Sequence, residues 1–352
     1  IGLWRHECDR VFSDRLINAA DKAWYTKAID ELTAKHFPTD AQKVLEDKWY
    51  FVDFLRPEEE TAEGEIFIPK VYEPVPDLET LRVRVDALME SYNEEVKGRN
   101  LDLVFFDDAL KHLMRISRIL RQPRGSALLV GVGGSGKQSL TRLAAFIAGC
   151  TTFQITITKS YGVSNLFDDL KVMYRTAGVT GKPVAFIFTD AEVKEESFLE
   201  YINNLLSSGE VPNLFAKDEM DLIIGELQVV VKKARPSLDP TYDNLYRFFI
   251  ERVRANLHVV LCMSPVGEKL RMRAQKFPGL ISGCTIDWFL RWPKDALLSV
   301  ARRFLGNFEM ASNDKKAETI DLVASMHDSV AGVSTKYFDR YRRHVYVTPK
   351  SY

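Results

Sequence analysis

The stretch Ala127-Leu-Leu-Val-Gly-Val-Gly-Gly-Ser-Gly-Lys137 decides the fold. Its first four residues are apolar and predict a short buried strand, and the glycines after them predict a tight loop. A helix is expected from about Lys137 to Ala148. Backbone N–H groups of such a loop can turn toward one phosphate, and the positive end of the helix dipole favours the same anion. Because the lysine can reach the β- and γ-phosphates, the stretch predicts a P-loop for a nucleoside triphosphate.

Two other interpretations of this loop are open to a test within the sequence. The glycines also satisfy the dinucleotide pattern GxGxxG, which requires an acid about 20 residues later, after the second strand. That strand is expected at Phe153–Thr158 and is followed by Lys159, not by an acid. The P-loop is therefore favoured over the dinucleotide fold and over a glycine turn without a ligand. The expected phosphate-binding residues are Gly131, Gly133, Gly134, Ser135, Gly136, Lys137, Gln138 and Ser139.

The loop departs from the usual pattern at one position. A P-loop ordinarily ends with Gly-Lys-Ser/Thr, whose hydroxyl binds Mg²⁺, but Gln138 follows the lysine here and Ser139 comes one residue late. A helix turns about 100° per residue, so the hydroxyl of Ser139 should point elsewhere. We expect ATP or ADP to bind, and we expect only a weak hold on Mg²⁺.

An acid follows the next continuous apolar strand. Asp190 ends the stretch Ala185-Phe-Ile-Phe-Thr-Asp190, which is where P-loop enzymes place the aspartate that holds Mg²⁺. ATPases of the AAA+ kind place a glutamate directly after it to polarise the attacking water. Ala191 stands there instead and Glu192 comes next, so Glu192 is either a displaced catalytic base or an acid on a solvated loop.

Apolar strands alternate with helices through the centre of the chain, which is typical of a parallel sheet covered on both faces. We predict an α/β P-loop fold of the AAA+ type with a five-stranded parallel sheet over residues 101–290. A helical small domain is expected over 291–352. Residues 1–60 should form helices up to about Phe54, ending in an acidic loop, and 61–100 a linker with a leading helix that begins near Asp77.

Composition excludes several classes of function. Lys and Arg number 48 and Asp and Glu 49, so no net charge draws the chain to nucleic acid or to a membrane surface. Four scattered cysteines and six dispersed histidines match no metal site, and no apolar run reaches the ~18 residues of a membrane span. The chain begins without Met, so we expect it to be a segment of a longer protein.

Several long motifs resemble dynein heavy chains, specifically the fourth AAA+ module of the motor ring in an axonemal-type version. The stretches that carry the resemblance are Gly131–Leu140, Phe186–Asp190, Phe198–Phe215, Lys276–Leu280, Thr285–Phe289 and Trp292–Pro293. Residues Leu3–Leu16 resemble the end of the third module's small domain. Val347–Tyr352 resembles the entry to the coiled-coil stalk that carries the microtubule-binding tip.

The resemblance implies further site residues. Ser264, after the strand Leu257–Cys262, would sense the γ-phosphate. Arg271 and Arg273 would reach the nucleotide of a neighbouring module, although solvated arginines on a helix are an equal alternative. The adenine would lie between the segment 103–106 and the pair Trp292-Pro293, although such apolar residues can simply be core. The candidates for contact with the adenine are Val104, Phe105, Trp292 and Pro293.

The resemblance also implies a role and partners. The chain would be a regulatory nucleotide-binding module that hydrolyses ATP slowly or not at all; the alternatives are an active ATPase with Glu192 as base, and a structural spacer with a locked nucleotide. Its partners would be neighbouring AAA+ modules, dynein intermediate and light chains, and microtubules only through the stalk tip, which this sequence lacks. Neither nucleic acid nor a membrane is implied. The expected location is the cytoplasm and cytoskeleton, in the axoneme of a cilium or flagellum.

Overall fold

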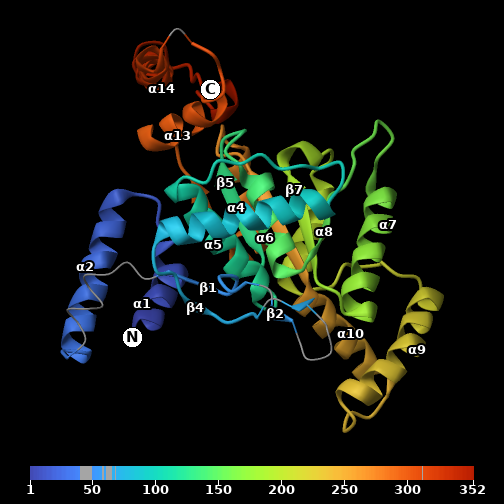
Figure 1. Ribbon diagram of the computed structural model, residues 1–352. Helices are drawn as coiled ribbons and strands as arrows, with labels where there is room; N and C mark the ends of the chain where they lie inside the picture. Colours follow the sequence, from blue (N-terminus) through green and yellow to red (C-terminus); the bar gives the residue numbers. More distant parts are fainter. Residues whose placement is uncertain (40–49, 58, 61–65, 68, 311) are drawn as a thin grey trace.

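A five-stranded parallel sheet forms the centre of the computed structural model, which describes residues 1–39, 50–57, 59–60, 66–67, 69–310 and 312–352 (Figure 1). The strands lie in the order β6-β7-β8-β5-β9, and every neighbouring pair is parallel. Their bounds are Ala127–Gly131 for β5, Thr151–Phe153 for β6, Val184–Thr189 for β7, Leu257–Met263 for β8 and Thr285–Phe289 for β9. The predicted α/β fold with five parallel strands is confirmed.

Helices cover both faces of this sheet because alternate side chains of each buried strand point to opposite sides. Leu129, Ile187 and Val260 belong to one apolar core, which they share with α4, α5 and α6. Leu128 and Phe186 belong to the second core, on the other face, with α7 to α10. The helices are α4 Leu78–Glu95, α5 Asp107–Arg121, α6 Lys137–Ala148, α7 Val163–Tyr174, α8 Ser197–Ser207, α9 Lys217–Ala234 and α10 Tyr242–Asn256; a π-helical turn, Arg175–Thr180, extends α7.

Helix α4 begins where the sequence predicts it. The side chain of Asp77 accepts a hydrogen bond from the backbone N–H of Thr80, which confirms it as the N-cap. The helix then buries Leu81, Val85 and Leu88 against α5 and α6.

The N-terminal part differs from the predicted run of helix. It forms α1 Gly2–Cys8, a π-helical turn Asp9–Ser13, and α2 Ala19–His36, which stands apart from the body in Figure 1 and exposes 71% of Trp24. The prediction of helix up to Phe54 was wrong: β1, Phe51–Val52, pairs with β4, Glu73–Pro74. Phe51, Val52 and Phe54 are all buried. Apolar residues at these positions are compatible with a short buried strand as well as with a helix.

Residues 40–49, within the predicted helical run, lie outside the described residues, as do parts of the acidic loop and the start of the linker at residue 61. The described flanks of that loop form a small hairpin, in which β2, Glu59–Glu60, pairs with β3, Ile66–Phe67.

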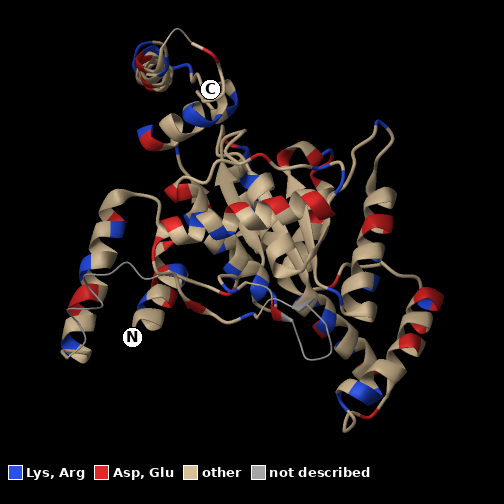
Figure 2. Ribbon diagram, viewed as in Figure 1, with Lys and Arg blue, Asp and Glu red and all other residues tan. Residues whose placement is uncertain are grey.

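The short helices α11 Lys269–Lys276 and α12 Gly279–Ser282 precede β9. The part after β9, which was predicted to be helical, contains α13 Lys294–Leu305 and α14 Asn313–Tyr341, and these two helices pack against each other. The chain then runs back and ends in a 3₁₀ turn, Pro349–Ser351. No helix among the described residues is long and apolar enough to cross a membrane. Figure 2 shows Lys and Arg intermixed with Asp and Glu along the chain, with the strands of the five-stranded sheet almost free of both.

Candidate nucleotide-binding site

The carboxyl ends of β5, β7 and β8 bring the site together. The glycine loop follows β5, Asp190 follows β7, and Ser264 follows β8, so the three lie along one edge of the parallel sheet. In open α/β sheets, ligands bind at this edge. A cavity of about 1120 Å³ opens there, and the glycine loop, Asp190 and Ser264 all line it.

The glycine loop has the backbone shape that the sequence predicts. Gly134 and Gly136 have φ of +79° and +88°, a left-handed conformation that favours glycine. Lys137 starts α6 and folds back over the loop: its Nζ donates to the carbonyl oxygens of Gly131 at 2.6 Å and Val132 at 2.8 Å. Burial lowers the pKa of Lys137. The ammonium therefore lies at the mouth of the loop, where an anion would relieve the cost of burying its charge.

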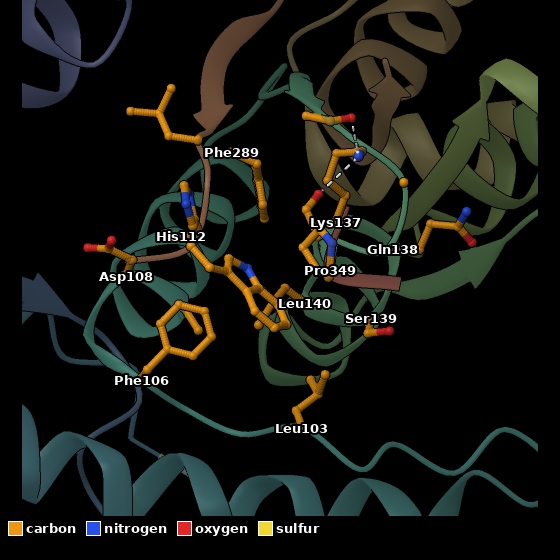
Figure 3. Close-up of a pocket in the computed structure, with 18 of the residues that line it drawn as sticks. Leu103, Phe106, Asp108, His112, Lys137, Gln138, Ser139, Leu140, Phe289 and Pro349 are labelled. Atoms are coloured by element: carbon orange, nitrogen blue, oxygen red, sulfur yellow. Dashed lines mark hydrogen bonds between the residues drawn. The ribbon is translucent and has the colours of Figure 1, made fainter. Parts of the chain in front are cut away.

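The first turn of α6 carries Gln138 and Ser139, whose side chains leave the helix in different directions (Figure 3). The Oε1 of Gln138 accepts a hydrogen bond from Arg142 at 3.2 Å and a longer one from Gln154 at 3.4 Å. Gln154 in turn donates to Glu192 at 2.7 Å. Gln138 thus belongs to a polar network that connects α6 with the end of β7.

The carboxylate of Asp190 is engaged on both oxygens. Its Oδ2 accepts from the backbone N–H of Ser264 at 2.6 Å, and its Oδ1 accepts from Arg273 at 2.7 Å. Among the described residues no three His, Cys, Asp or Glu side chains group as a metal site would require. Arg273 and Ser264 therefore occupy the carboxylate that would otherwise hold a magnesium ion, directly or through water.

Glu192 lies on the far side of the turn that follows β7. It is only 6% exposed and does not line the cavity. Its Oε2 accepts from the backbone N–H of Thr189 at 2.5 Å, and its Oε1 accepts from Gln154. Burial raises the pKa of Glu192. Of the two interpretations that the sequence left open, the solvated loop acid does not hold, since the side chain is buried within the fold.

The two arginines of α11 are placed differently from each other. Arg271 is exposed, as a residue that reaches a neighbour must be. Arg273 is 7% exposed and binds Asp190 and, at 2.9 Å, Glu196 of its own chain. As the structure stands, Arg273 is turned inward and is not presented to a neighbouring module, because two carboxylates satisfy its guanidinium.

The aromatic end of the cavity holds three of the four predicted adenine contacts. Val104, Trp292 and Pro293 line it, whereas Phe105 is 4% exposed and packs into the core beside α4 to α6. Phe106 lines the cavity instead, with its ring 5.3 Å from that of Trp292. The chain is extended here, so successive side chains point in opposite directions. Phe105 therefore points into the core, and Phe106, the next residue, points into the cavity.

Sequence reasoning missed a histidine at this end. His112 of α5 lines the cavity and stacks on Phe289 of β9, with ring centroids 3.8 Å apart and an interplanar angle of 9°. Its Nδ1 lies 2.7 Å from the carboxylate of Asp287. The available signal was a lone acid in Thr285-Ile-Asp-Trp-Phe289, because a charge on a buried strand requires partners.

The C-terminal turn also reaches the site. Pro349 and Tyr352 line the cavity, and Figure 3 shows Pro349 beside Lys137. A Cβ on Gly134 would lie 2.7 Å from the backbone nitrogen of Lys350, so the turn rests directly on the glycine loop. Tyr352 fixes it by donating to the carbonyl oxygen of Leu297 at 2.8 Å.

Comparison with known proteins agrees with this geometry. Residues 101–352 match the family described as P-loop containing dynein motor region D4. The chain is 55% identical over 358 residues to dynein axonemal heavy chain 5 of Mus musculus, with 99% of the chain and 8% of that protein covered. It is 52% identical to dynein axonemal heavy chain 8 of Homo sapiens and to the dynein gamma chain, flagellar outer arm, of Chlamydomonas reinhardtii, with 100% of the chain and 8% of each covered.

Proposed function

Because this chain belongs to the dynein heavy-chain family as its P-loop motor region D4, we propose that it holds ATP or ADP and hydrolyses ATP slowly or not at all. One contrast carries the proposal. The glycine loop and Lys137 are built for a phosphate, while the two carboxylates that hydrolysis would need are bound to the protein itself. The module would then regulate the motor through its bound nucleotide and contribute little turnover.

Phosphate binding would use the backbone N–H groups of the glycine loop and the positive end of α6, which directly follows the loop. Lys137 would exchange the carbonyl oxygens of Gly131 and Val132 for phosphate oxygens. The adenine ring of the nucleotide would extend toward Val104, Phe106 and Trp292. A nucleotide supplies the negative charge that the buried ammonium lacks in this arrangement.

Weak dependence on Mg²⁺ follows from the same geometry. Asp190 is held by Arg273 and by Ser264, and Gln138 replaces the hydroxyl that ordinarily binds the ion. Titration of a fluorescent ATP analogue with and without Mg²⁺ tests the proposal. We expect saturable binding in both cases, with affinities that agree within about threefold, or less than about 1 kcal/mol. No binding at high micromolar nucleotide would contradict the proposal.

Substituting Glu192 tests whether this module turns over ATP. We expect Glu192→Gln to leave steady-state phosphate release unchanged, because the carboxylate faces Gln154 and Thr189 and not the cavity. The measurement belongs in the heavy chain that contains this module, where neighbouring modules are present. Loss of a general base lowers a rate by about 100-fold or more. A decrease of that size at this module would show that Glu192 is the base of an active ATPase.

The control for this measurement is Glu195→Gln, a nearby glutamate of the same loop that lies outside the network of Glu192. It should match the wild-type rate whichever interpretation holds. A parallel loss of activity in both variants would indicate damage to the fold, which circular dichroism would detect.

A structural spacer with a locked nucleotide is the second candidate, and one contact favours it. The turn Pro349–Ser351 rests on Gly134 and lies next to Lys137, where it would hinder exit of the phosphates. Exchange of retained nucleotide against an excess of labelled ADP separates the candidates: exchange within seconds supports a regulatory module, and retention for hours supports the spacer.

The setting of the module is inferred from its relatives, since the chain spans about 8% of their length. We place it in the motor ring of an axonemal dynein heavy chain, between neighbouring AAA+ modules of the same chain. Contact with microtubules, and association with intermediate and light chains, would belong to other parts of the assembly. The location that follows is the axoneme of a cilium or flagellum.

A further inference from the structure

His112 lies at the aromatic end of the cavity and is held there from two sides. Its ring stacks on Phe289, and Figure 3 shows His112 on the same side as Phe106, with Phe289 between His112 and Lys137. Asp287 holds the ring in its plane through Nδ1, at 2.7 Å. An imidazole fixed in this way presents one ring edge in one orientation, which is what a residue that reads a ligand requires.

Asp287 sets the tautomer of this histidine. The carboxylate is 1% exposed and also accepts from Arg115 at 2.9 Å. The ion pair with Arg115 keeps this buried carboxylate ionised. An ionised carboxylate only accepts hydrogen bonds, so the proton between the two residues lies on Nδ1. Nε2 has no hydrogen-bond partner among the described residues and is free for a ligand.

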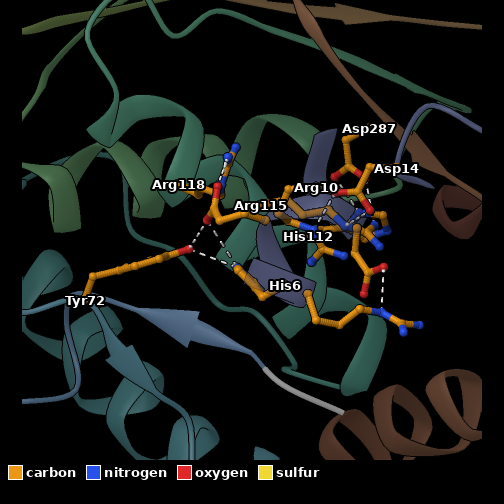
Figure 4. Close-up of polar contacts among 11 residues, drawn as sticks. His6, Arg10, Asp14, Tyr72, His112, Arg115, Arg118 and Asp287 are labelled. Carbon is orange, nitrogen blue, oxygen red and sulfur yellow. Dashed lines mark hydrogen bonds and ion pairs between the residues drawn. The ribbon is translucent and has the colours of Figure 1, made fainter. Parts of the chain in front are cut away.

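The charges around Asp287 balance without a proton on Nε2. Figure 4 shows Arg10, Asp14, Arg115 and Asp287 together beside His112. Arg10 lies 2.8 Å from Asp14, and Arg115 lies 3.3 Å from Asp14 and 2.9 Å from Asp287. Two cations therefore face two anions. With a proton on Nδ1 alone, the imidazole adds no charge to these four residues, and its Nε2 is a hydrogen-bond acceptor.

We propose that His112 is a specificity-determining residue, whose Nε2 accepts a hydrogen bond from the exocyclic amino group of adenine. Guanine carries a carbonyl oxygen at the corresponding position, which would face the lone pair of Nε2 and be repelled. The pocket would thus prefer adenine to guanine nucleotides. Asp287 and Arg115 are positioning residues, since they act on the base only through the ring of His112. This inference rests on the proposed nucleotide binding.

Three ligands test the inference: ATP, GTP and inorganic tripolyphosphate, each titrated by calorimetry against the wild-type chain and His112→Phe. The phenyl ring keeps the stack on Phe289 but has no Nε2. We expect ATP affinity to decrease by about 3- to 10-fold, the net value of one hydrogen bond. The affinities for GTP and for tripolyphosphate should not decrease. His36→Phe, in the last turn of α2, is the matched control and should change no affinity.

The outcomes separate failure of the inference from failure of the proposed function. A wild-type chain that binds neither ATP nor tripolyphosphate refutes the proposed function. Normal binding of tripolyphosphate, with ATP and GTP weakened equally or not at all by His112→Phe, refutes the role of His112 alone.

A second measurement needs no substitution in the pocket. In a long-range ¹H–¹⁵N spectrum of the imidazoles, His112 should show a protonated Nδ1 and an unprotonated Nε2. The Nε2 resonance should move on addition of ATP and stay in place on addition of tripolyphosphate. A doubly protonated ring, or a resonance that ATP does not move, would overturn the proposal.

Discussion

Replacing Lys137 with alanine is expected to weaken ATP binding by about 30- to 1000-fold. Removing one partner of a buried charge pair costs about 2–4 kcal/mol, which gives that range. Here the ammonium already lies 2.6 Å from the carbonyl oxygen of Gly131, at the mouth of the loop, so it needs no large movement to reach a phosphate. Equilibrium titration with a fluorescent ATP analogue measures the loss.

The folded chain should tolerate this substitution. Burial lowers the pKa of Lys137, which means that the fold disfavours its charged form at neutral pH. Alanine removes that cost together with the three hydrogen bonds of the ammonium, so we expect the free energy of unfolding without nucleotide to change by less than about 1 kcal/mol. Lys232→Ala, on exposed α9, is the charge-matched control. Unaltered ATP affinity in Lys137→Ala would sink the phosphate role.

Replacing Asp287 with asparagine is expected to lower the free energy of unfolding by about 3–5 kcal/mol, the cost of breaking a buried ion pair. Asparagine has nearly the same volume, so the effect isolates the charge. The cluster would keep Arg10 and Arg115 but only one anion, Asp14. Urea unfolding at pH 7, followed by far-UV circular dichroism, measures the difference.

The difference should depend on pH in a known direction. Contacts with His112 and Arg115 lower the pKa of Asp287 in the folded chain, against the effect of burial. A carboxyl whose folded pKa is depressed contributes stability above its unfolded pKa, about 4, and loses it as the pH falls through the folded value. The amide that replaces it does not titrate. The gap between the wild-type and the Asp287→Asn protein should therefore be full at about pH 5–7 and narrow progressively below about pH 4.

A surface pair gives the control for this experiment. Asp328 lies 2.5 Å from Arg291, and both side chains are about half exposed. Asp328→Asn should cost less than about 1 kcal/mol, because exposed ion pairs contribute little. If Asp287→Asn costs no more than Asp328→Asn, the buried cluster does not contribute as we describe.

The phosphate loop and its neighbours could be predicted from the sequence because their signals are local. The glycines, the lysine and the apolar strand before them determine β5 and α6 within a few residues, and α6 has the predicted bounds. The signal for the N-cap at Asp77 is equally local, since the Asp77 side chain accepts from the backbone N–H of Thr80, three residues later.

What the sequence did not reveal depends on contacts between distant segments. The edge strand β9 carries a buried charge at Asp287, which interrupts its apolar pattern. The partners of Asp287 are His112 and Arg115 of α5, about 170 residues earlier in the chain. The inward turn of Arg273 depends on Asp190 and Glu196, which no spacing rule connects to it. Phe106 lines the cavity in place of the predicted Phe105, because the sequence of an extended segment does not show which of two successive side chains faces the core.

The ion pairs around Arg115 have a consequence for the order of folding. They join the N-terminal segment at Asp14 to α5, and α5 to the edge strand at Asp287, 172 positions further along the chain. Contacts between such distant positions must first overcome the entropy of closing a long loop. We expect this corner to form late, so that weakening it accelerates unfolding far more than it slows refolding. Stopped-flow measurement of both rates for Asp14→Asn would show whether the corner closes after the sheet is complete.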